Sequence, residues 1–162
     1  MPRLALLLSA LVALNVTALP GQHSFAPTIG VSVGYQSSDS DHFVYAVHLT
    51  VPLGAGWELA PWFRLSTASQ AQRRASLPLR RLFPLAPNAK WYAGAGVSWT
   101  DEIGQIQPHG HWGALVFLGS EYAPATLSWE HSRVRLFGEV QVFTFSYGTS
   151  QVLVGLRLRV GH

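Results

Sequence analysis

Two short groups of residues carry side chains that catalysis or metal binding would need. Glu130, His131 and Ser132 follow one another directly, and a histidine beside a serine is a pair that hydrolases use for nucleophilic attack. Adjacent residues of a strand point to opposite faces, so this pair could cooperate only in a loop or a bulge. Because no base oriented toward a nucleophile can be identified, we interpret the group as a polar turn and predict no catalytic residue.

The second group is His109 and His111, with Asp101 and Glu102 in the same stretch. Residues two apart on an extended segment share a face, so the two imidazoles could bind a surface metal. Short histidine clusters without fixed geometry give many false matches, and we predict no metal site and no cofactor. The glycines of Gly94–Gly96 lie inside an expected strand with no helix after them, which excludes a phosphate loop.

The composition excludes several classes of protein. Charged residues make up only 12% of the chain and hydrophobic residues 48%, so apolar surface must be covered or must face lipid. The absence of cysteine excludes disulfides, thiolate metal sites and thiol catalysis. The 11 lysine and arginine residues are scattered singly or in pairs, and without a basic stripe we predict no nucleic-acid partner.

The first 20 residues are expected to be a cleaved signal peptide. A short positive segment, Met1–Arg3, precedes an apolar run from Leu4 to Val16, as in secreted proteins. The alternative is a retained transmembrane anchor, which needs about 18 apolar residues. Asn15 interrupts this run and Pro20 closes it, which favours cleavage and export.

Residues 21–162 predict one all-β domain. Eight stretches of about ten residues alternate between apolar and polar or small residues, and turn residues separate them. No stretch shows a convincing helical period. The expected strands are 25–36, 43–53, 57–68, 74–85, 90–99, 110–122, 134–145 and 152–160.

Each expected strand has one apolar face, and the opposite face combines glycine, hydroxyl groups and single charges. In the last strand the apolar face holds Val152, Val154, Leu156, Leu158 and Val160, and the other face holds Leu153, Gly155, Arg157 and Arg159. A soluble barrel of the lipocalin type would turn the apolar face inward, whereas a membrane barrel turns it outward. Small residues on the polar face leave room inside a narrow barrel. These are Gly30, Gly34, Gly94, Gly96 and Gly119.

Large aromatic residues on the apolar face favour the membrane barrel, because they lie near the strand ends. Trp91 and Trp99 are eight residues apart, which is about 27 Å along a strand and roughly 20 Å along the axis of a tilted barrel. That spacing matches two aromatic girdles on either side of a lipid band. The expected girdles are Trp57, Trp91 and Tyr122 beside the short turns, and Tyr35, Phe43, Trp99 and Trp112 beside the other loops. The sequence therefore predicts an eight-stranded, antiparallel, up-and-down transmembrane β-barrel.

The later strands resemble those of the small eight-stranded outer-membrane barrels, such as the OmpA membrane domain and OmpX. The resemblance is carried by "WYAGAGVSW" (91–99), "LGSEYAP" (118–124), "VRLFGEVQVFTF" (134–145) and "LVGLRLRV" (153–160). Before Trp91 it is a resemblance of pattern only. It implies location in the bacterial outer membrane, a periplasmic N-terminus, contact with lipid and with the barrel-assembly machinery, and a lumen closed by ion pairs. The ending "RVGH" departs from the aromatic C-terminus usual in this family.

The resemblance also implies inward-facing charges, with Glu121 and Glu139 as acids and Arg157 and Arg159 as bases. Alternation adds Glu58, Arg64, Arg80 and Arg135 to the lumenal face. An unpaired charge in a narrow interior costs several kcal/mol, so we expect a hydrogen-bonded network, with the excess arginine solvated or bound to an anion. Arg80 and Arg81 cannot both face the lumen without a bulge, and we expect Arg81 to reach the interface.

The resulting hypothesis is a monomeric outer-membrane barrel, not an enzyme, with a structural or interaction role such as envelope integrity or surface contact. Large-solute transport is not expected, because wide channels need about 16 strands. One alternative is a lipid-modifying enzyme, which would need a polar cluster on the outer face near one girdle. The other is a secreted lipocalin-like binder of apolar ligands, which would place Ile29, Val31, Leu156 and Leu158 inside.

Overall fold

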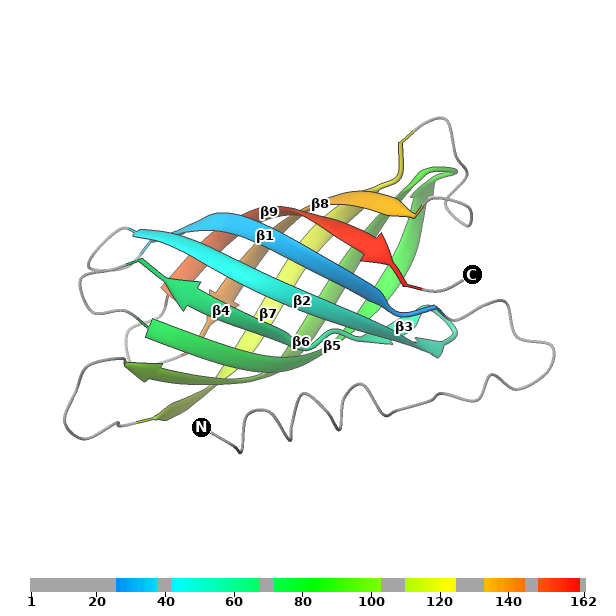
Figure 1. Ribbon diagram of the computed structural model, residues 1–162. Helices are drawn as coiled ribbons and strands as arrows, with labels where there is room; N and C mark the ends of the chain where they lie inside the picture. The colour runs from blue at the N-terminus through cyan, green and yellow to red at the C-terminus, as the bar shows by residue number, and fades with distance from the viewer. Residues whose placement is uncertain are drawn as a thin grey trace.

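The computed structural model describes residues 26–37, 42–67, 72–102, 110–124, 133–144 and 149–160. These residues form one closed antiparallel β-barrel (Figure 1). The expected signal peptide lies outside them, as do His109 and the Glu130–Ser132 group. None of the described residues forms a helix long and apolar enough to cross a membrane.

The strands run close to the bounds that the sequence predicts. They are β1 (Thr28–Ser37), β2 (His42–Gly54), β3 (Trp57–Leu59), β4 (Trp62–Ser66), β5 (Gln72–Ala86), β6 (Ala89–Glu102), β7 (His111–Tyr122), β8 (Val134–Phe143) and β9 (Thr149–Arg159). β3 and β4 are two parts of one barrel strand, since both pair with β2 on one side and β5 on the other. The barrel therefore has eight strands, which confirms the predicted fold class.

The break between β3 and β4 falls at Ala60 and Pro61, where the sequence predicts a continuous strand. Proline has no backbone N–H to donate, so the ladder loses one bond there. The neighbouring backbone groups stay paired, since Leu49 N–H donates to Pro61 O and Ala60 N–H donates to Pro78 O, both at 2.9 Å. The side chains keep their alternation across the break.

Pairing of β1 with β9 closes the sheet, from Thr28 opposite Arg159 to Ser37 opposite Ser150. The two ends of the barrel differ. At one end, here called the turn end, β2 joins β3 through Gly54, Ala55 and Gly56, and β5 joins β6. All three residues of the first turn have positive φ, which glycine adopts without strain. The opposite end, where β1, β4, β6 and β8 finish, is called the loop end.

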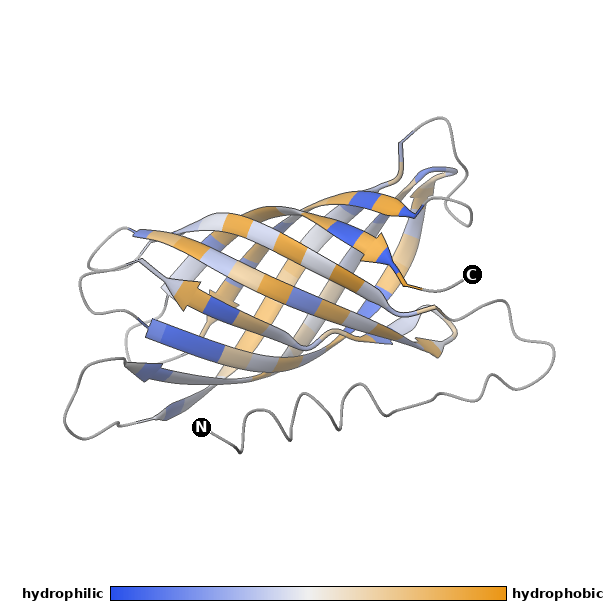
Figure 2. Cartoon of the chain, in the orientation of Figure 1, coloured by the Kyte–Doolittle hydropathy of each residue, from blue (hydrophilic) through white to orange (hydrophobic). Residues whose placement is uncertain are grey.

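The two faces of the sheet alternate as a membrane barrel requires. Ile29 and Leu156 are 48% and 42% exposed on the outer face, whereas Arg157, next in sequence to Leu156, is 2% exposed. Apolar and polar residues alternate along the strands in Figure 2. Val31 and Leu158 also lie outside, so the lipocalin-like alternative, which places these side chains inside, is wrong.

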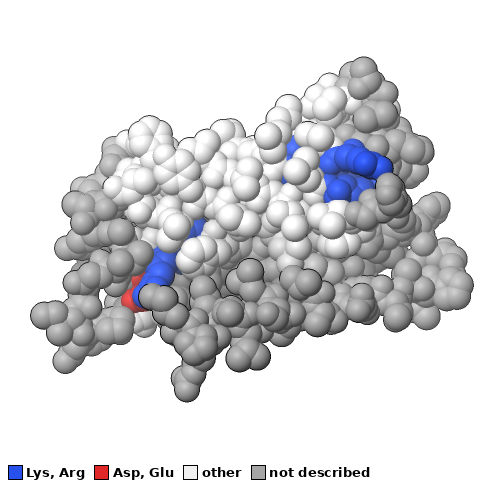
Figure 3. Space-filling model, viewed as in Figure 1, with Lys and Arg blue, Asp and Glu red and all other residues white. Residues whose placement is uncertain are grey.

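Charged side chains on the outside gather toward the ends of the barrel. In Figure 3 lysine and arginine lie near the two ends of the visible face, and uncharged described residues fill the area between them. This distribution fits an apolar band of lipid-facing residues with charge at its borders.

The fourth expected strand, whose register the sequence leaves open, is continuous as β5. Arg80 is buried in the lumen and Arg81 is exposed on the outer face, so no bulge separates them. The bulge in β5 lies later, between Pro84 and Ala86, where it meets the turn.

Glycine on the inner face makes room for large side chains, and Gly119 shows this clearly. A Cβ atom added there would lie 2.5 Å from the Tyr92 hydroxyl and 2.6 Å from the Gly138 carbonyl oxygen. Gly138, on the adjacent strand, faces outward, and a Cβ atom there would meet nothing within 4 Å.

These two glycines give a matched test of the inner packing. Gly119→Ala should lower the free energy of unfolding by about 1–3 kcal/mol, the usual cost of overpacking. Gly138→Ala, one strand away, should leave it unchanged or raise it slightly. Denaturant titration of both variants in liposomes measures the difference. Equal effects would contradict the assignment of the two faces.

Candidate functional site

Charged side chains from five strands meet in the half of the lumen near the turn end. This group, called the ion-pair network, comprises Glu58 on β3, Arg80 on β5, Glu121 on β7, Arg135 and Glu139 on β8, and Arg157 on β9. All six side chains are buried. Alternation along each strand brings them inward, and closure of the sheet brings the strands together.

Glu121 lies at the centre of the network. Its Oε1 atom is 2.7 Å from Arg80 Nη1 and also forms an ion pair with Arg157 Nη1. Arg135 Nη1 lies 3.8 Å from the second oxygen, Oε2. The carboxylate, 1% exposed, thus lies within ion-pair distance of guanidinium groups from three strands. The attraction within a buried ion pair repays the cost of removing both charges from water only when additional hydrogen bonds satisfy the remaining polar atoms.

Arg80 links the centre to a second acid. Its Nε donates a hydrogen bond to Glu58 Oε2 at 2.8 Å, and its Nη2 lies 2.5 Å from the same oxygen. Glu58 and Arg80 are directly opposite each other on β3 and β5. The fork of the guanidinium therefore spans two carboxylates, those of Glu58 and Glu121, which suits its planar shape.

Glu139 connects the network to uncharged polar groups. Tyr92 Oη donates a hydrogen bond to Glu139 Oε2 at 2.7 Å, and Gln141 Nε2 donates to Glu139 Oε1. Gln151 in turn donates to the side-chain oxygen of Gln141. Arg157 Nη2 lies 3.7 Å from Glu139 Oε2. The acid is therefore held by neutral donors more closely than by a base.

Aromatic rings fill the space beside the guanidinium groups. The Arg157 Cζ atom lies 4.0 Å from the centroid of the Phe137 ring, and the Arg80 Cζ atom 4.4 Å from that of Tyr92. Cation–π contact of this kind contributes most where water is excluded. Ion pairs and rings together occupy this half of the lumen.

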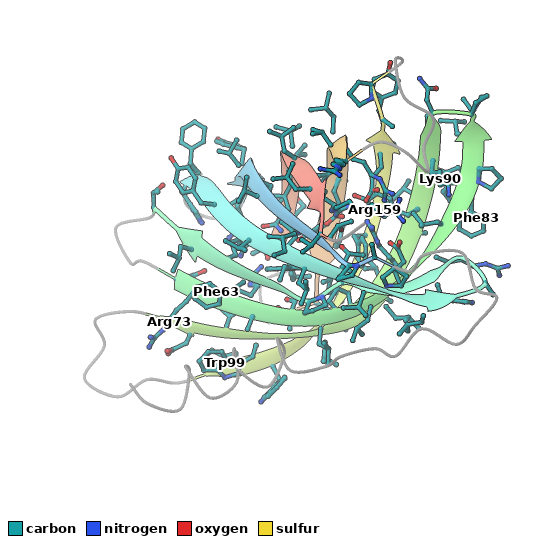
Figure 4. The ribbon with its side chains drawn as sticks, turned by 45° about the vertical axis from the view of Figure 1, so that its right-hand side comes forward. Phe63, Arg73, Phe83, Lys90, Trp99 and Arg159 are labelled. Carbon is teal, nitrogen blue, oxygen red and sulfur yellow. The ribbon has the colours of Figure 1, made fainter. Side chains whose placement is uncertain are left out.

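Arg64, which the sequence assigns to the network, lies apart from it. Arg64 is buried in the lumen near the loop end, six residues along the strand from Glu58, or about 20 Å. Among the described side chains it forms no ion pair with a carboxylate. Arg159 is on the lumenal face at the turn end, where it is only partly buried (Figure 4).

Sequence reasoning missed Arg74 and the polar partners of Glu139. Arg74 is buried, and its Nε donates a hydrogen bond to Thr100 Oγ1 at 2.7 Å. The signal was available, because Arg74 and Arg80 are an even number of residues apart on one strand and share a face. The sequence left the register of that strand open, so Arg74 was not assigned to the lumen.

The predicted girdle residues all lie on the outer face. Trp57, Trp91 and Tyr122 are near the turn end, and Tyr35, Phe43, Trp99 and Trp112 near the loop end. At the loop end Trp99 is opposite Trp112, and the Tyr35 and Phe43 rings meet edge to face at 6.0 Å.

At the turn end the outer face holds one cluster that the sequence did not predict. Phe83 stacks on Trp91 with ring centroids 4.1 Å apart, and the Arg81 Cζ atom lies 5.5 Å from the Phe83 ring and 5.6 Å from the Trp57 ring. Arg81 therefore lies outside the barrel at this end. This position agrees with the expectation that its side chain reaches the membrane–water interface.

The described outer face gives little support to catalysis. Ser120 is an exposed hydroxyl in the apolar band, but its cross-strand neighbours are Trp91 and Gly138, neither of which is a base. His111 is exposed at the start of β7. Among the described residues no group of three or more histidines and acids could hold a metal ion.

A closed barrel with an aliphatic outer band and charges inside has the architecture of a transmembrane β-barrel, because closure gives each strand a hydrogen-bonded neighbour on both sides. The chain has the fold of the small eight-stranded outer-membrane barrels, as similar solved structures show. It aligns with Neisserial surface protein A at 14% identity and a TM-score of 0.65, over 84% of this chain and 97% of that one.

Two other structures have the same fold. The N-terminal barrel domain of Pseudomonas aeruginosa OprF aligns at 13% identity and a TM-score of 0.62, over 85% of this chain and 100% of that one. Ail, the attachment invasion locus protein of Yersinia pestis, aligns at 10% identity and a TM-score of 0.57, over 83% and 97%. No protein-family model and no curated protein matches the sequence.

Loss of the central acid should destabilise the barrel strongly. Glu121→Gln leaves Arg80 and Arg157 buried with less compensating charge, and we expect a loss of about 3–5 kcal/mol in the free energy of unfolding. Adding Arg157→Met should recover part of this loss, because one of the unpaired charges is removed. Denaturant titration of the single and double variants measures this coupling. A double variant that loses the full sum of the single effects would contradict the ion pair.

Proposed function

We propose that this protein is a closed barrel of the bacterial outer membrane whose role is structural or interactive rather than transport. The observation that carries the proposal is the ion-pair network centred on Glu121, which fills the lumen near the turn end. An eight-stranded barrel is just wide enough for its interior to be filled by side chains. Because the lumen is filled, we infer that the protein acts through contacts made by its outer surface rather than by transport.

The fold neighbours support this proposal in general terms. One is called a surface protein and another an attachment invasion locus protein, and both are small barrels of the same fold. Contact with other cells or with envelope components is the corresponding role for this chain. We propose that it acts as a monomer, since the lipid-facing band is continuous around the described strands.

The proposal includes an orientation. The resemblance to small outer-membrane barrels implies a periplasmic N-terminus, so the first described residues would lie on the periplasmic side. The turn end, where Pro27 O accepts a hydrogen bond from Val160 N–H, then faces the periplasm. The loop end faces the exterior. Assembly requires the barrel-assembly machinery, as the resemblance implies.

A lipid-modifying enzyme has less support. Such an enzyme needs a nucleophile and an oriented base on the outer face near a girdle. Ser120 is well placed for lipid contact but has no base among its cross-strand neighbours.

Planar-bilayer recording tests the closed lumen. We expect the purified chain to insert without steady conductance steps, because charged and aromatic side chains occupy the interior. A 16-stranded porin recorded in the same bilayers is the positive control. Heat-modifiable migration in detergent should show that the same preparation is folded. Stable, long-lived openings of a folded preparation would contradict the proposal.

A further inference from the structure

The outer face of the barrel carries a groove over β6, β7, β8 and β9. It has a volume of about 720 Å³, and its lining includes Trp91, Leu118, Val140 and Val152. Ligand sites in proteins commonly have volumes of about 300–1,000 Å³. Val152 is 54% exposed and faces away from the lumen, so the groove opens toward the surrounding lipid. It lies on the opposite side of the sheet from the side chains of the ion-pair network.

Two small residues form the floor of the groove. Ser120 is directly opposite Gly138, and this pair lies between Trp91 on β6 and Val154 on β9. A Cβ atom at Gly138 would meet nothing within 4 Å, so the space above the backbone is open. The Ser120 hydroxyl is exposed and makes no hydrogen bond within the described part of the chain. A ligand in the groove would therefore meet one free hydroxyl among apolar walls.

Arg81 lies at one end of this groove. In the registers of β5, β6 and β7, Arg81 is opposite Ala93, and Ala93 is opposite Leu118 in the groove wall. Neighbouring strands are about 4.8 Å apart, so the backbones of Arg81 and Leu118 are separated by about 10 Å. The side chain between them is a methyl group, which leaves the path open. An acyl chain, which spans about 15 Å in one leaflet, covers this distance.

The groove slants from the turn-end girdle toward the middle of the lipid-facing band. Directly opposite residues form a row that starts at Trp57 of the turn-end girdle, passes Arg81 and then Leu118. The same row continues through Val140 and Val152 and reaches Tyr35 of the loop-end girdle. Such a row crosses the band obliquely because the strands are tilted. Arg81 is therefore at the border of the band, and the groove runs to the depth of the acyl chains.

Arg81 is an exposed cation at this border. Its Cζ atom lies 5.6 Å from the centroid of the Trp57 ring and 5.5 Å from that of Phe83. None of the described acids forms an ion pair with it. Arg73, on the outer face near the loop end, differs, because its Nη2 lies 2.7 Å from Asp101 Oδ2. The guanidinium fork of Arg81 is therefore available to a phosphate group.

We propose that Arg81 and the groove bind one phospholipid with an anionic headgroup. The phosphate contacts the Arg81 guanidinium, and one acyl chain follows the groove across Gly138 toward Val152. The Ser120 hydroxyl, beside Trp91, donates to an ester carbonyl of the lipid. A headgroup with its own ammonium group would place a second cation beside Arg81, so an anionic headgroup binds more tightly. The site rests on the proposed function, since it requires a barrel in a membrane, and it adds the class of lipid bound.

Native mass spectrometry of the folded chain counts the lipids that it retains. The protein is released from alkyl-glycoside micelles that contain either dioleoyl-phosphatidylglycerol or dioleoyl-phosphatidylcholine at matched concentrations. Heat-modifiable migration first shows that each preparation is folded. We expect the wild type to retain one phosphatidylglycerol at lipid concentrations where phosphatidylcholine is not retained. The half-saturating concentration of phosphatidylglycerol is the quantity compared among variants.

Two variants each remove one part of the site. Arg81→Gln should raise the half-saturating concentration about fivefold, as expected for the loss of one arginine near an anionic headgroup. Gly138→Leu fills the groove and should raise it by at least as much, with Arg81 in place. The controls are Arg73→Gln, which removes the same charge near the loop end, and Ala75→Leu, which introduces leucine on the outer face outside the groove. Both should retain phosphatidylglycerol as the wild type does.

Four results would overturn the proposal. Equal retention of the two lipids by the wild type would exclude a site for anionic headgroups. An effect of Arg73→Gln as large as that of Arg81→Gln would show a response to net charge alone. Unchanged retention in Gly138→Leu would contradict binding in the groove. A dimer that Gly138→Leu abolishes, with no lipid retained, would assign the groove to a second copy of the chain.

The lipid site and the proposed function can fail separately. Loss of lipid selectivity in a folded barrel would leave the closed lumen intact. Steady conductance in planar bilayers would contradict the closed lumen and leave lipid retention unchanged, because the groove is on the outer face.

Discussion

The pairing of β1 with β9 is the constraint on which the rest of this structure depends. Without it, two strands would present unpaired N–H and C=O groups, which lipid cannot satisfy. Once the sheet is closed, each residue must face either lipid or a narrow interior. The alternation of exposed aliphatic residues with inward-facing residues along β9, from Val152 to Arg159, follows directly from that choice.

Closure also explains why the interior is charged and filled. A small barrel has too little interior volume for water to solvate many ions, so each charge must find a partner or a ligand. Glu121 meets this need for Arg80 and Arg157 together, and aromatic rings pack beside both guanidinium groups.

The sequence predicts which face each residue occupies far better than which residues meet. Alternation alone places Glu58, Glu121, Glu139 and Arg157 inside, as the structure shows. It does not give the level of a residue along the axis, because that level depends on the stagger between strands. For this reason Arg64 was expected beside the acids, although its cross-strand neighbour is Arg74.

Other differences have local causes. The strand expected over 57–68 is broken at Pro61, which has no backbone N–H to donate. The alternation of apolar and polar side chains continues through this position and so does not reveal the break. The hydrogen bond of Tyr92 to Glu139 joins β6 to β8, so it is visible only once the strands are placed. Gln141, by contrast, lies two residues from Glu139 on β8 and shares its face. The turn through Gly54 and Gly56 was predictable, because its positive φ angles need glycine.

The orientation of the two faces is the central claim, and β9 offers a direct measurement of it. The chain has no cysteine, so Val152→Cys and Leu153→Cys each give a single reactive thiol. Val152 is 54% exposed on the outer face and Leu153 is fully buried, and neither belongs to the ion-pair network.

In liposomes of folded protein, a membrane-permeant fluorescent maleimide should label Val152→Cys, and brominated lipid should quench the attached probe. Leu153→Cys should react only after unfolding. The account would be contradicted if the Val152→Cys thiol were buried while Leu153→Cys reacted, or if the two behaved alike.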